Sequence, residues 1–464
     1  MTNAQEILQR AEQLRRELPE GFRDALVQSL YAEAQRLTQR AVHTRGDRRY
    51  DLDQWIDRLV TGPITGLLIM LLLLTVVIWL TVSGANVFSD ALAQVLFGIR
   101  DLGRALFQQL GMPWWLTGFV WDGVYLALAW VVSVMFPPMA IFFPLFTFLE
   151  DLGYLPRVAF NMDWLFQRVG AHGKQALTMA MGLGCNAAGV VATRIIDSPR
   201  ERLIAILTNN FMPCNGRFPT LIMLATAFVA AGFGGALAAF IAASAVVAVV
   251  LIGVGFTLLM SWLLSRTLLR GEASAFTLEL PPYRRPNFLR ILYTSFIDRT
   301  IFVLLRAMST AAPAGAVIWL LGNIHVGEGS LALAIARGLD GFGRLFGLDG
   351  AILLAYIIAL PANEIVVPTL MMIYTNAGAM VEAPEGVEAI RALLIGQQGW
   401  TLLTAINLML FSLLHNPCAT TILTIYKETR SAFWAAVSVV ITLGTAFLVT
   451  FLVATAARLL GLAA

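Results

Sequence analysis

The chain has 464 residues, of which 58% are hydrophobic and only 13% are charged, and its formal net charge is +3 at pH 7. The charged fraction is about half that of an ordinary soluble domain, and the mean hydropathy is +0.74. These values exclude a disordered chain, a nucleic-acid-binding protein and an ordinary cytosolic enzyme. They fit an all-α, polytopic membrane protein, because a bilayer accepts so much apolar surface. Membrane lipid is therefore an expected partner, and nucleic acid is not.

Residues 1–60 are the polar part of the chain. Apolar side chains recur at helical spacing on both sides of Pro19-Glu-Gly21, and arginines crowd the segment. The positive-inside rule places such a segment in the cytoplasm. We predict a cytoplasmic amphipathic helical linker over 1–60. Because it does not open on an apolar run, it does not resemble a cleaved leader.

Apolar runs predict about eight to ten membrane segments, two of them short or broken. We assign a first membrane half to 61–264 and a second to 301–464. Six arginines in 265–300 mark a cytoplasmic connector between the halves. The expected runs are 64–82, 118–134 with its second half 140–149, 175–195, 203–230, 234–264, 301–322, 349–376, 399–424 and 431–460, and 85–117 is amphipathic.

Proline and glycine interrupt several of these runs. Unwound backbone at membrane depth survives only where it is buried or lines a cavity, and in transporters such breaks often mark the substrate site. The candidate breaks are Pro137-Pro138, Gly182-Leu-Gly-Cys-Asn186, Met212 to Pro219, Pro361-Ala-Asn-Glu364 and His415-Asn-Pro-Cys418.

All three cysteines lie in these breaks. Cys185 precedes Asn186, Cys214 follows Met212 by two residues, and Cys418 closes the last break. Thiolate, thioether and amide oxygen together suit a late first-row divalent ion or Cu(I). Structural zinc sites use close Cys pairs, which this sequence lacks, so we predict a transient site assembled from separate segments. The alternative is that each cysteine is a small apolar packing residue.

Two carboxylates stand in or beside apolar runs: Glu150, which is followed by Asp151, and Glu364. A charge in lipid costs roughly 2.5–3.5 kcal/mol on insertion scales, so such groups usually face a cavity and pair with something. A transported cation is one partner for Glu364, and a structural ion pair or a helix cap is the alternative. Glu150 and Asp151 equally fit a helix end. His415 suits a ligand or proton carrier as well as a buried, hydrogen-bonded ring.

The sequence has no motif for hydrolytic or nucleotide chemistry. A P-loop needs Gly-x4-Gly-Lys-Ser/Thr, and neither of the two lysines, Lys174 and Lys427, stands in that context. A serine nucleophile elbow and a His-Glu-x-x-His pair are also missing. We therefore expect neither an enzyme nor a nucleotide site in this chain.

Motifs at and around the breaks resemble those of the FeoB family of bacterial ferrous-iron transporters, in its membrane portion. The similarity covers roughly residues 28–455 in the family's order and spacing. The segments that carry it are Leu149-Glu-Asp-Leu-Gly-Tyr-Leu-Pro-Arg157, Gly182-Leu-Gly-Cys-Asn186, Asn210-Phe-Met-Pro-Cys214 with Arg217-Phe-Pro219, Glu279-Leu-Pro-Pro-Tyr-Arg284, Asn363-Glu-Ile-Val-Val-Pro-Thr369, and Pro417-Cys-Ala-Thr420 with Lys427-Glu428-Thr429.

The resemblance implies two gate regions, about 140–250 and 345–425, that flank a metal path, with Fe(II) as the transported substrate. The family's G domain is missing ahead of the first span, so the resemblance predicts a separately encoded GTPase as partner. The family's motifs point to Cys185, Asn186, Cys214, Glu150, Glu364 and Cys418 as site residues, and the donor chemistry described above adds Met212.

Two departures from the commoner family pattern bear on selectivity. Ala187-Ala188 stand where Val-Pro is frequent, and Asn363 stands where a Lys often precedes the Glu. Without that Lys, Glu364 has no neighbouring positive charge in the sequence, which strengthens cation binding or alters selectivity.

The sequence thus predicts an all-α helical bundle with two gate-type regions of broken or re-entrant helices. We expect it in the bacterial inner membrane, with a cytoplasmic N-terminus, importing Fe(II) through a path lined by Cys, Met, Asn and Glu. The alternatives are another divalent metal, an organic solute such as a nucleoside, and a membrane receptor that docks a GTPase without transport. A homo-oligomer is compatible with the sequence.

Overall fold

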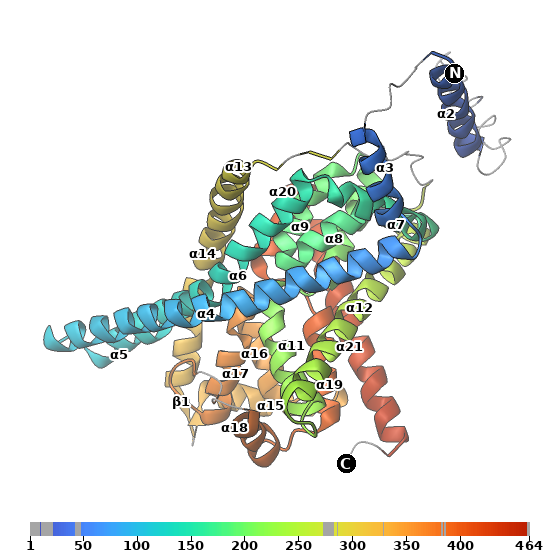
Figure 1. Cartoon of the computed structure of the whole chain (residues 1–464). Helices are drawn as coiled ribbons and strands as arrows, with labels where there is room; N and C mark the ends of the chain where they lie inside the picture. Colours follow the sequence, from blue (N-terminus) through green and yellow to red (C-terminus); the bar gives the residue numbers. More distant parts are fainter. Residues whose placement is uncertain are drawn as a thin grey trace, which may run out of the picture.

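The computed structural model describes residues 10, 22–41, 48–271, 283–284, 286–327, 329–381, 384 and 387–461. Over this part of the chain the fold is helical, as predicted, and the only strands are β1 (His325–Val326) and β2 (Gly329–Ser330). They pair antiparallel, with His325 opposite Ser330. The helices form a bundle in which several are interrupted at mid-depth (Figure 1).

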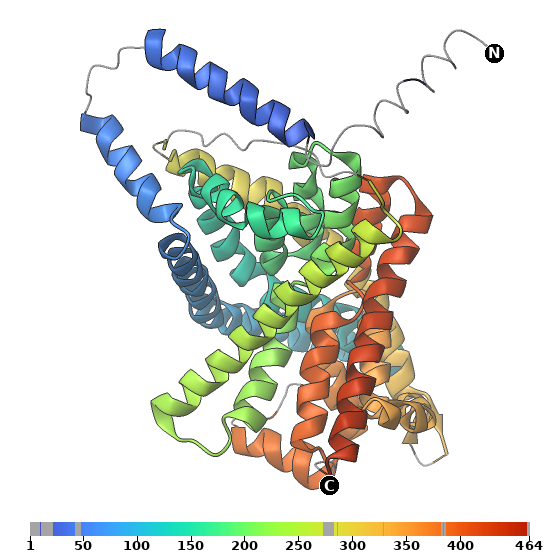
Figure 2. The same cartoon turned by 90° about the vertical axis from the view of Figure 1, so that its right-hand side faces the viewer.

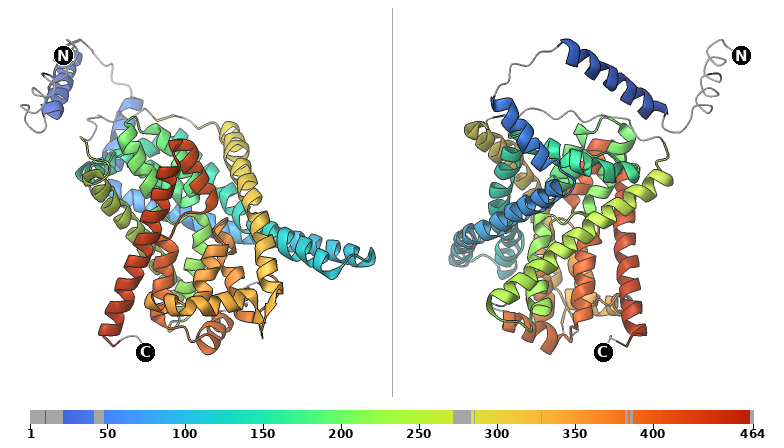
Figure 3. Two further views of the ribbon diagram at one scale, coloured as in Figure 1. Left: turned by 180° about the vertical axis from the view of Figure 1, so that it is seen from behind. Right: turned by 45° about the vertical axis from the view of Figure 1, so that its right-hand side comes forward.

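The N-terminal helices lie at one end and along one side of this bundle. α2 (Phe22–Ala41) and α3 (Arg48–Val60) precede α4 (Thr65–Gln109), which turns from α3 by 86°. We expected a span over 64–82 and a separate amphipathic segment over 85–117, but one continuous helix runs to Gln109. The far end of α4 and the short α5 (Trp114–Thr117) project to one side (Figure 3).

The first membrane half alternates long and short helices. The π-helical η1 (Gly118–Tyr125) leads into α6 (Leu126–Asp151), which packs along α4 and against the later α14. The elements that follow are α7 (Tyr154–Arg168), α8 (Gln175–Gly184), α9 (Asn186–Ala192), η2 (Thr193–Ile195), α10 (Pro199–Thr208), η3 (Asn209–Phe211), η4 (Asn215–Arg217), α11 (Phe218–Leu224), η5 (Ala225–Val229) and α12 (Gly235–Arg266).

One predicted break is wrong. The sequence predicts an interruption at Pro137-Pro138, but α6 continues through both residues and through Pro144. A proline inside a helix frees one carbonyl rather than ending the helix outright, and membrane helices tolerate this when neighbours pack around them. Pro137 and its neighbours Met135 and Met139 are buried in the bundle.

The first described helix after α12 is α13 (Phe288–Tyr293), which lies within the residues that we assigned to the connector. The later elements are η6 (Thr294–Ile301), α14 (Phe302–Asn323), α15 (Leu331–Leu345), α16 (Gly350–Ile358), η7 (Asn363–Ile365), α17 (Val366–Thr375), α18 (Val387–Arg391), η8 (Ala392–Gln397), α19 (Leu402–Leu414), α20 (Ala419–Thr429) and α21 (Ala432–Leu459).

Five helical stretches among the described residues are long and apolar enough to cross a bilayer, and two bent pairs raise the number to seven. This is fewer than the eight to ten expected, because half-helices such as α8 and α11 are each too short to span alone. The five are Trp114–Asp151, Leu237–Arg266, Phe288–Asn323, Leu402–Thr429 and Ala432–Leu459, and the bent pairs are Asp53–Val60 with Thr65–Thr81 and Leu331–Leu345 with Gly350–Ile358.

The two halves run in opposite senses. α11 leads away from the end of the bundle that carries α3, and α12 returns to it, whereas α19 and α20 rise towards that end and α21 descends to the C-terminus (Figures 1 and 2). Opposed repeats with interrupted helices are typical of secondary transporters, whose substrate sites lie at the interface of the repeats. In this chain η4, in a break of the first half, contacts η7, in a break of the second half, so breaks of the two halves meet inside the bundle.

Candidate metal path between the broken helices

Four of the predicted breaks are confirmed. Cys185 is extended between α8 and α9, and Met212 and Cys214 are extended between η3 and η4. In the second half, Ala362 is extended ahead of η7, and the backbone is extended again from His415 to Cys418, between α19 and α20. A break interrupts the helical hydrogen-bond ladder, so some carbonyl and N–H groups around it need partners elsewhere inside the bundle.

Arg217 supplies partners to two of these breaks. Its side chain is 1% exposed. One terminal nitrogen donates to the carbonyl oxygens of Asn210 at 3.0 Å and Leu413 at 2.7 Å, and the other to those of His415 at 3.1 Å and Asn416 at 3.5 Å. A single guanidinium thus bonds the break of the first half to a break of the second.

Asparagines hold the break at Cys185. With its amide nitrogen facing carbonyl groups, Asn186 donates to Gly182 at 3.1 Å and to Met212 at 3.2 Å. Asn209 donates to the carbonyl of Asn186 at 3.1 Å, and its side-chain oxygen has no hydrogen-bond partner among the described residues. A Cβ at Gly189 would lie 2.6 Å from the Asn209 nitrogen, so the close approach of these segments requires glycine there.

The closest grouping of predicted site residues is at Cys214. The side-chain nitrogen of Asn363 lies 3.9 Å from the Cys214 sulfur. The neighbouring Glu364 carboxylate rests directly on Gly216, where a Cβ would collide with it. Since η4 and η7 contact each other, a thiol, an amide and a carboxylate from opposite halves converge at this crossing.

The three thiols lie within electrostatic range of one another but do not form a closed metal site. Cys185 has Cys418 and Cys214 as electrostatic neighbours, and Cys418 also has Glu364 as one. In the described ranges, no three His, Cys, Asp or Glu side chains are arranged to hold a metal ion. The three thiols lie at three different breaks, with Cys185 and Cys214 buried and Cys418 half-buried.

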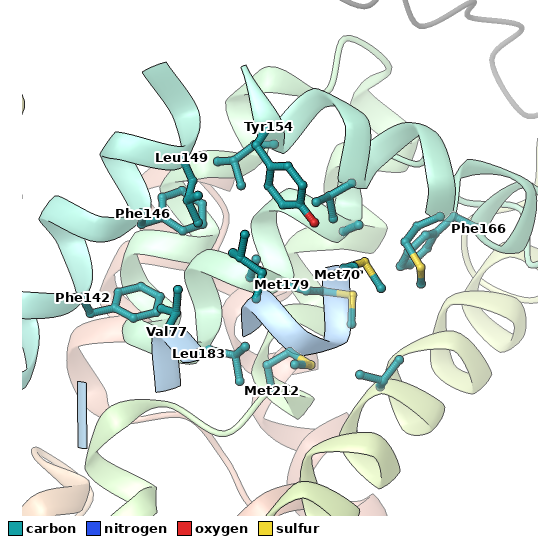
Figure 4. A pocket seen from close by; sticks show the side chains of 17 residues that line it. Met70, Val77, Phe142, Phe146, Leu149, Tyr154, Phe166, Met179, Leu183 and Met212 are labelled. Atoms are coloured by element: carbon teal, nitrogen blue, oxygen red, sulfur yellow. The ribbon is translucent and has the colours of Figure 1, made fainter. Parts of the chain in front are cut away.

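The side chain of Met212 faces a cavity outside the group formed by Cys214, Asn363 and Glu364. Its side chain lines an apolar cavity of about 130 Å³ between α4, α6, α7 and α8, which it shares with Met70, Met179 and aromatic rings (Figure 4). None of the thiols lines this cavity. The Met212 side chain therefore faces a cavity that no cysteine lines, while its backbone carbonyl accepts a hydrogen bond from Asn186.

Glu150 does not belong to the group formed by Cys214, Asn363 and Glu364. It lines a vestibule of about 780 Å³ between α6, α9, α14 and α20, whose mostly apolar wall also carries the charged side chains of Glu428 and Arg194. Arg194 donates to both oxygens of Glu428, at 2.8 and 2.6 Å. The wall includes Ala188, three residues beyond Cys185, so this vestibule opens next to the first break.

Several residues of this region were missed by the sequence reasoning. Glu428 and Arg217 stood in family-like motifs without an assigned role, and Asn363 was treated only as a departure. Asn209 had one usable signal, because a pair of asparagines, Asn209 and Asn210, lies one residue ahead of the Met-Pro-Cys break. A buried carboxamide beside broken backbone is an expected way to satisfy free peptide groups.

Long apolar spans, breaks at mid-depth and buried polar side chains at those breaks define a multi-pass helical membrane protein of the gate-containing type. Residues 132–228 match a gate model described as "Nucleoside recognition", and residues 246–298 match "Ferrous iron transport protein B C terminus". The chain belongs to the FeoB family and corresponds to its membrane portion.

Similar curated proteins agree with this assignment. The Fe(2+) transporter FeoB of Staphylococcus aureus (strain MSSA476) is 28% identical over 420 residues, which are 88% of this chain and 59% of that protein. A Fe(2+) transport protein A/FeoB fusion protein of Porphyromonas gingivalis is 27% identical over 72% of this chain and 43% of its own length. The Fe(2+) transporter FeoB of Salmonella typhimurium is 31% identical over 254 residues, which are 54% of this chain and 31% of that protein. No solved structure matches.

The chain thus spans about 59% of the length of the Staphylococcus relative.

Proposed function

We propose that this chain forms the path by which Fe(II) crosses the membrane. The observation that carries the proposal is the convergence of Cys214, Asn363 and Glu364 where the breaks of the two halves cross. Sulfur, amide and carboxylate donors suit a late first-row divalent ion, and Fe(II) is the ion in the names of the relatives.

The donors suggest an order along the path. An ion that leaves the group at Cys214 and Glu364 next meets Cys185 and Cys418, and then the vestibule that Glu150 lines. Because the donors are spread out, each stop holds the ion weakly, as conduction requires. Asn186 and the backbone of Met212 shape the first break in this proposal, and the thioether lies beside the route.

We also propose an orientation and a partner. Helices α7, α8 and α9 lie at the end that carries α3 (Figure 1), and Arg157, Lys174 and Arg194 belong to or directly flank these helices. By the positive-inside rule this end faces the cytoplasm in our proposal, with the inner membrane as the location. A GTPase acting on the linker helices α2 and α3 would control access to the path, whether or not it is encoded separately.

The deciding experiment is anaerobic Fe(II) flux into proteoliposomes that hold this chain. The variant Cys185→Ser/Cys214→Ser should lose at least tenfold in flux, and Ser309→Ala, which changes an exposed hydroxyl, should not. Flux that is unaltered in the double variant would refute the site. Flux of a nucleoside, insensitive to both cysteines, would favour the organic-solute alternative. GTPase binding with no flux, even with GTP present, would favour a receptor.

A further inference from the structure

Arg157 on α7 makes a set of contacts that the proposed path does not use. Its side chain is 1% exposed and is among the largest fully buried side chains in the described chain. Its Nε donates to Asp57 Oδ1 at 2.7 Å, a terminal nitrogen donates to Asp57 Oδ2 at 3.3 Å, and the other donates to the Gly153 carbonyl at 2.5 Å. Its guanidinium carbon lies 3.7 Å from the centroid of the Tyr283 ring.

These contacts join three segments that are far apart in sequence. Asp57 belongs to the linker helix α3, Arg157 to α7 in the first membrane half, and Tyr283 to the connector between the halves. Burial and the neighbouring Asp57 carboxylate raise the pKa of Tyr283 to about 12, so its hydroxyl stays protonated. A flat guanidinium that makes a forked ion pair and stacks on a ring fixes orientation as well as distance.

α3 is attached to α7 at a second point one turn further on. Asn161 donates to the carbonyl of Val60, the last residue of α3, at 2.8 Å. Asn161 and Arg157 are four residues apart and so lie on one face of α7. Two side chains of α7 therefore hold the end of the linker helix, and α3 cannot shift without breaking these bonds or carrying α7 with it.

α7 in turn is tied to the helix that ends at Cys185. The Asp163 carboxylate of α7 accepts from the backbone N–H of Gly173 at 2.9 Å, just before α8, and α7 packs on α8. α8 then runs as ten helical residues, a rod of roughly 15 Å, to Cys185. The 130 Å³ cavity lies between these two helices and Met212, which leaves room for them to move.

We infer that Arg157 is a positioning residue that couples the linker helix to the first break: displacement of α3 reaches Cys185 through α7 and α8. A protein that binds the linker would act by pulling on Asp57. This inference deepens the proposed control of access and rests on it. A buried ion pair adds little net stability compared with apolar packing, so this one serves the placement of three segments more than their stability.

The test measures thiol reactivity in the full chain in liposomes, with Cys214→Ala/Cys418→Ala so that Cys185 is the only thiol. Asp57→Asn should raise the rate of Cys185 labelling at least fivefold, because the buried thiol becomes accessible when α3 is released. In Asp57→Glu, which keeps the carboxylate, the rate of Cys185 labelling should stay nearer that of the parent. Asp101→Asn, which breaks an exposed ion pair with Arg100 on α4, is the matched control.

Tyr283→Leu gives a second variant if Asp57→Asn does not assemble. It keeps the ion pair and removes the stacking face, so labelling should rise about twofold. The coupling would be refuted if the rate of Cys185 labelling in both variants equalled that in Asp101→Asn, whatever their unfolding temperature. Arg157 would then have only a structural role. Labelling needs no iron, so loss of coupling and absence of Fe(II) flux are separate results.

Discussion

Replacing Arg217 by methionine should destabilise the chain by about 3 kcal/mol. Arg217 makes three N–H···O=C bonds of 3.1 Å or less and a fourth at 3.5 Å. A buried carbonyl that loses its partner costs roughly 1–3 kcal/mol. Three such losses at the lower end give about 3 kcal/mol. We take the lower end because the variant no longer has to desolvate a guanidinium.

The accessible measurement is equilibrium unfolding of the detergent-solubilised chain by SDS titration. Arg217→Lys keeps the charge, but an ammonium group cannot span four carbonyls from two breaks, so we expect about half the loss. Arg290→Met changes an exposed arginine on α13 and should stay within about 0.5 kcal/mol of the parent. A loss below about 1 kcal/mol in Arg217→Met would refute the view that this residue holds the two halves together.

Three further changes separate function from stability. Gly216→Ala should push the Glu364 carboxylate aside and lower Fe(II) flux severalfold with little change in unfolding, because a side-chain end can move cheaply. Glu428→Gln breaks the pair with the largely exposed Arg194, so the unfolding free energy should change by less than about 1 kcal/mol while flux falls. His172→Asn should flatten the loss of stability as the pH falls below about 6.5, measured by unfolding at each pH. Burial lowers the pKa of His172, so the unfolded chain takes up the proton first and the parent loses stability as pH falls.

Controls for these changes are present in the chain. Gly232→Ala, at a glycine with open space around it, should leave flux unchanged. Equal flux in Gly216→Ala and Gly232→Ala would remove Glu364 from the path. Burial also raises the pKa of Asp163, so this carboxyl adds stability in acid and opposes the effect of His172. The quantity to compare is therefore the slope of the unfolding free energy against pH in His172→Asn and in the parent. An identical slope in both would show that His172 does not titrate between the two states.

The positions of the breaks were predictable, because proline, glycine and small polar residues interrupt apolar runs at Cys185, Cys214, Ala362 and Cys418. The same rule failed at Pro137, where packing on both sides keeps the helix intact. Local composition reports the loss of a backbone donor, and only the tertiary environment decides whether the helix ends there.

The partners across the breaks were not predictable. Arg217 bonds to carbonyl oxygens of Leu413 and His415, almost two hundred residues further along the chain. Backbone carbonyls are present at every position, so no sequence pattern marks these acceptors. The same holds for Asp57 and Arg157, which form an ion pair across one hundred residues of sequence without a local pattern that marks it.

The charges around Cys214 bear on how an ion would leave. Arg217 and Glu364 are both electrostatic neighbours of this thiol, one positive and one negative. One basic and one acidic side chain therefore act on this thiol, whereas a site built from several carboxylates has acidic neighbours alone. A divalent ion gains attraction from Glu364 but meets repulsion from Arg217, which stays in place because its donors are committed to carbonyls. In a path that must release its ion, that balance favours passage over storage.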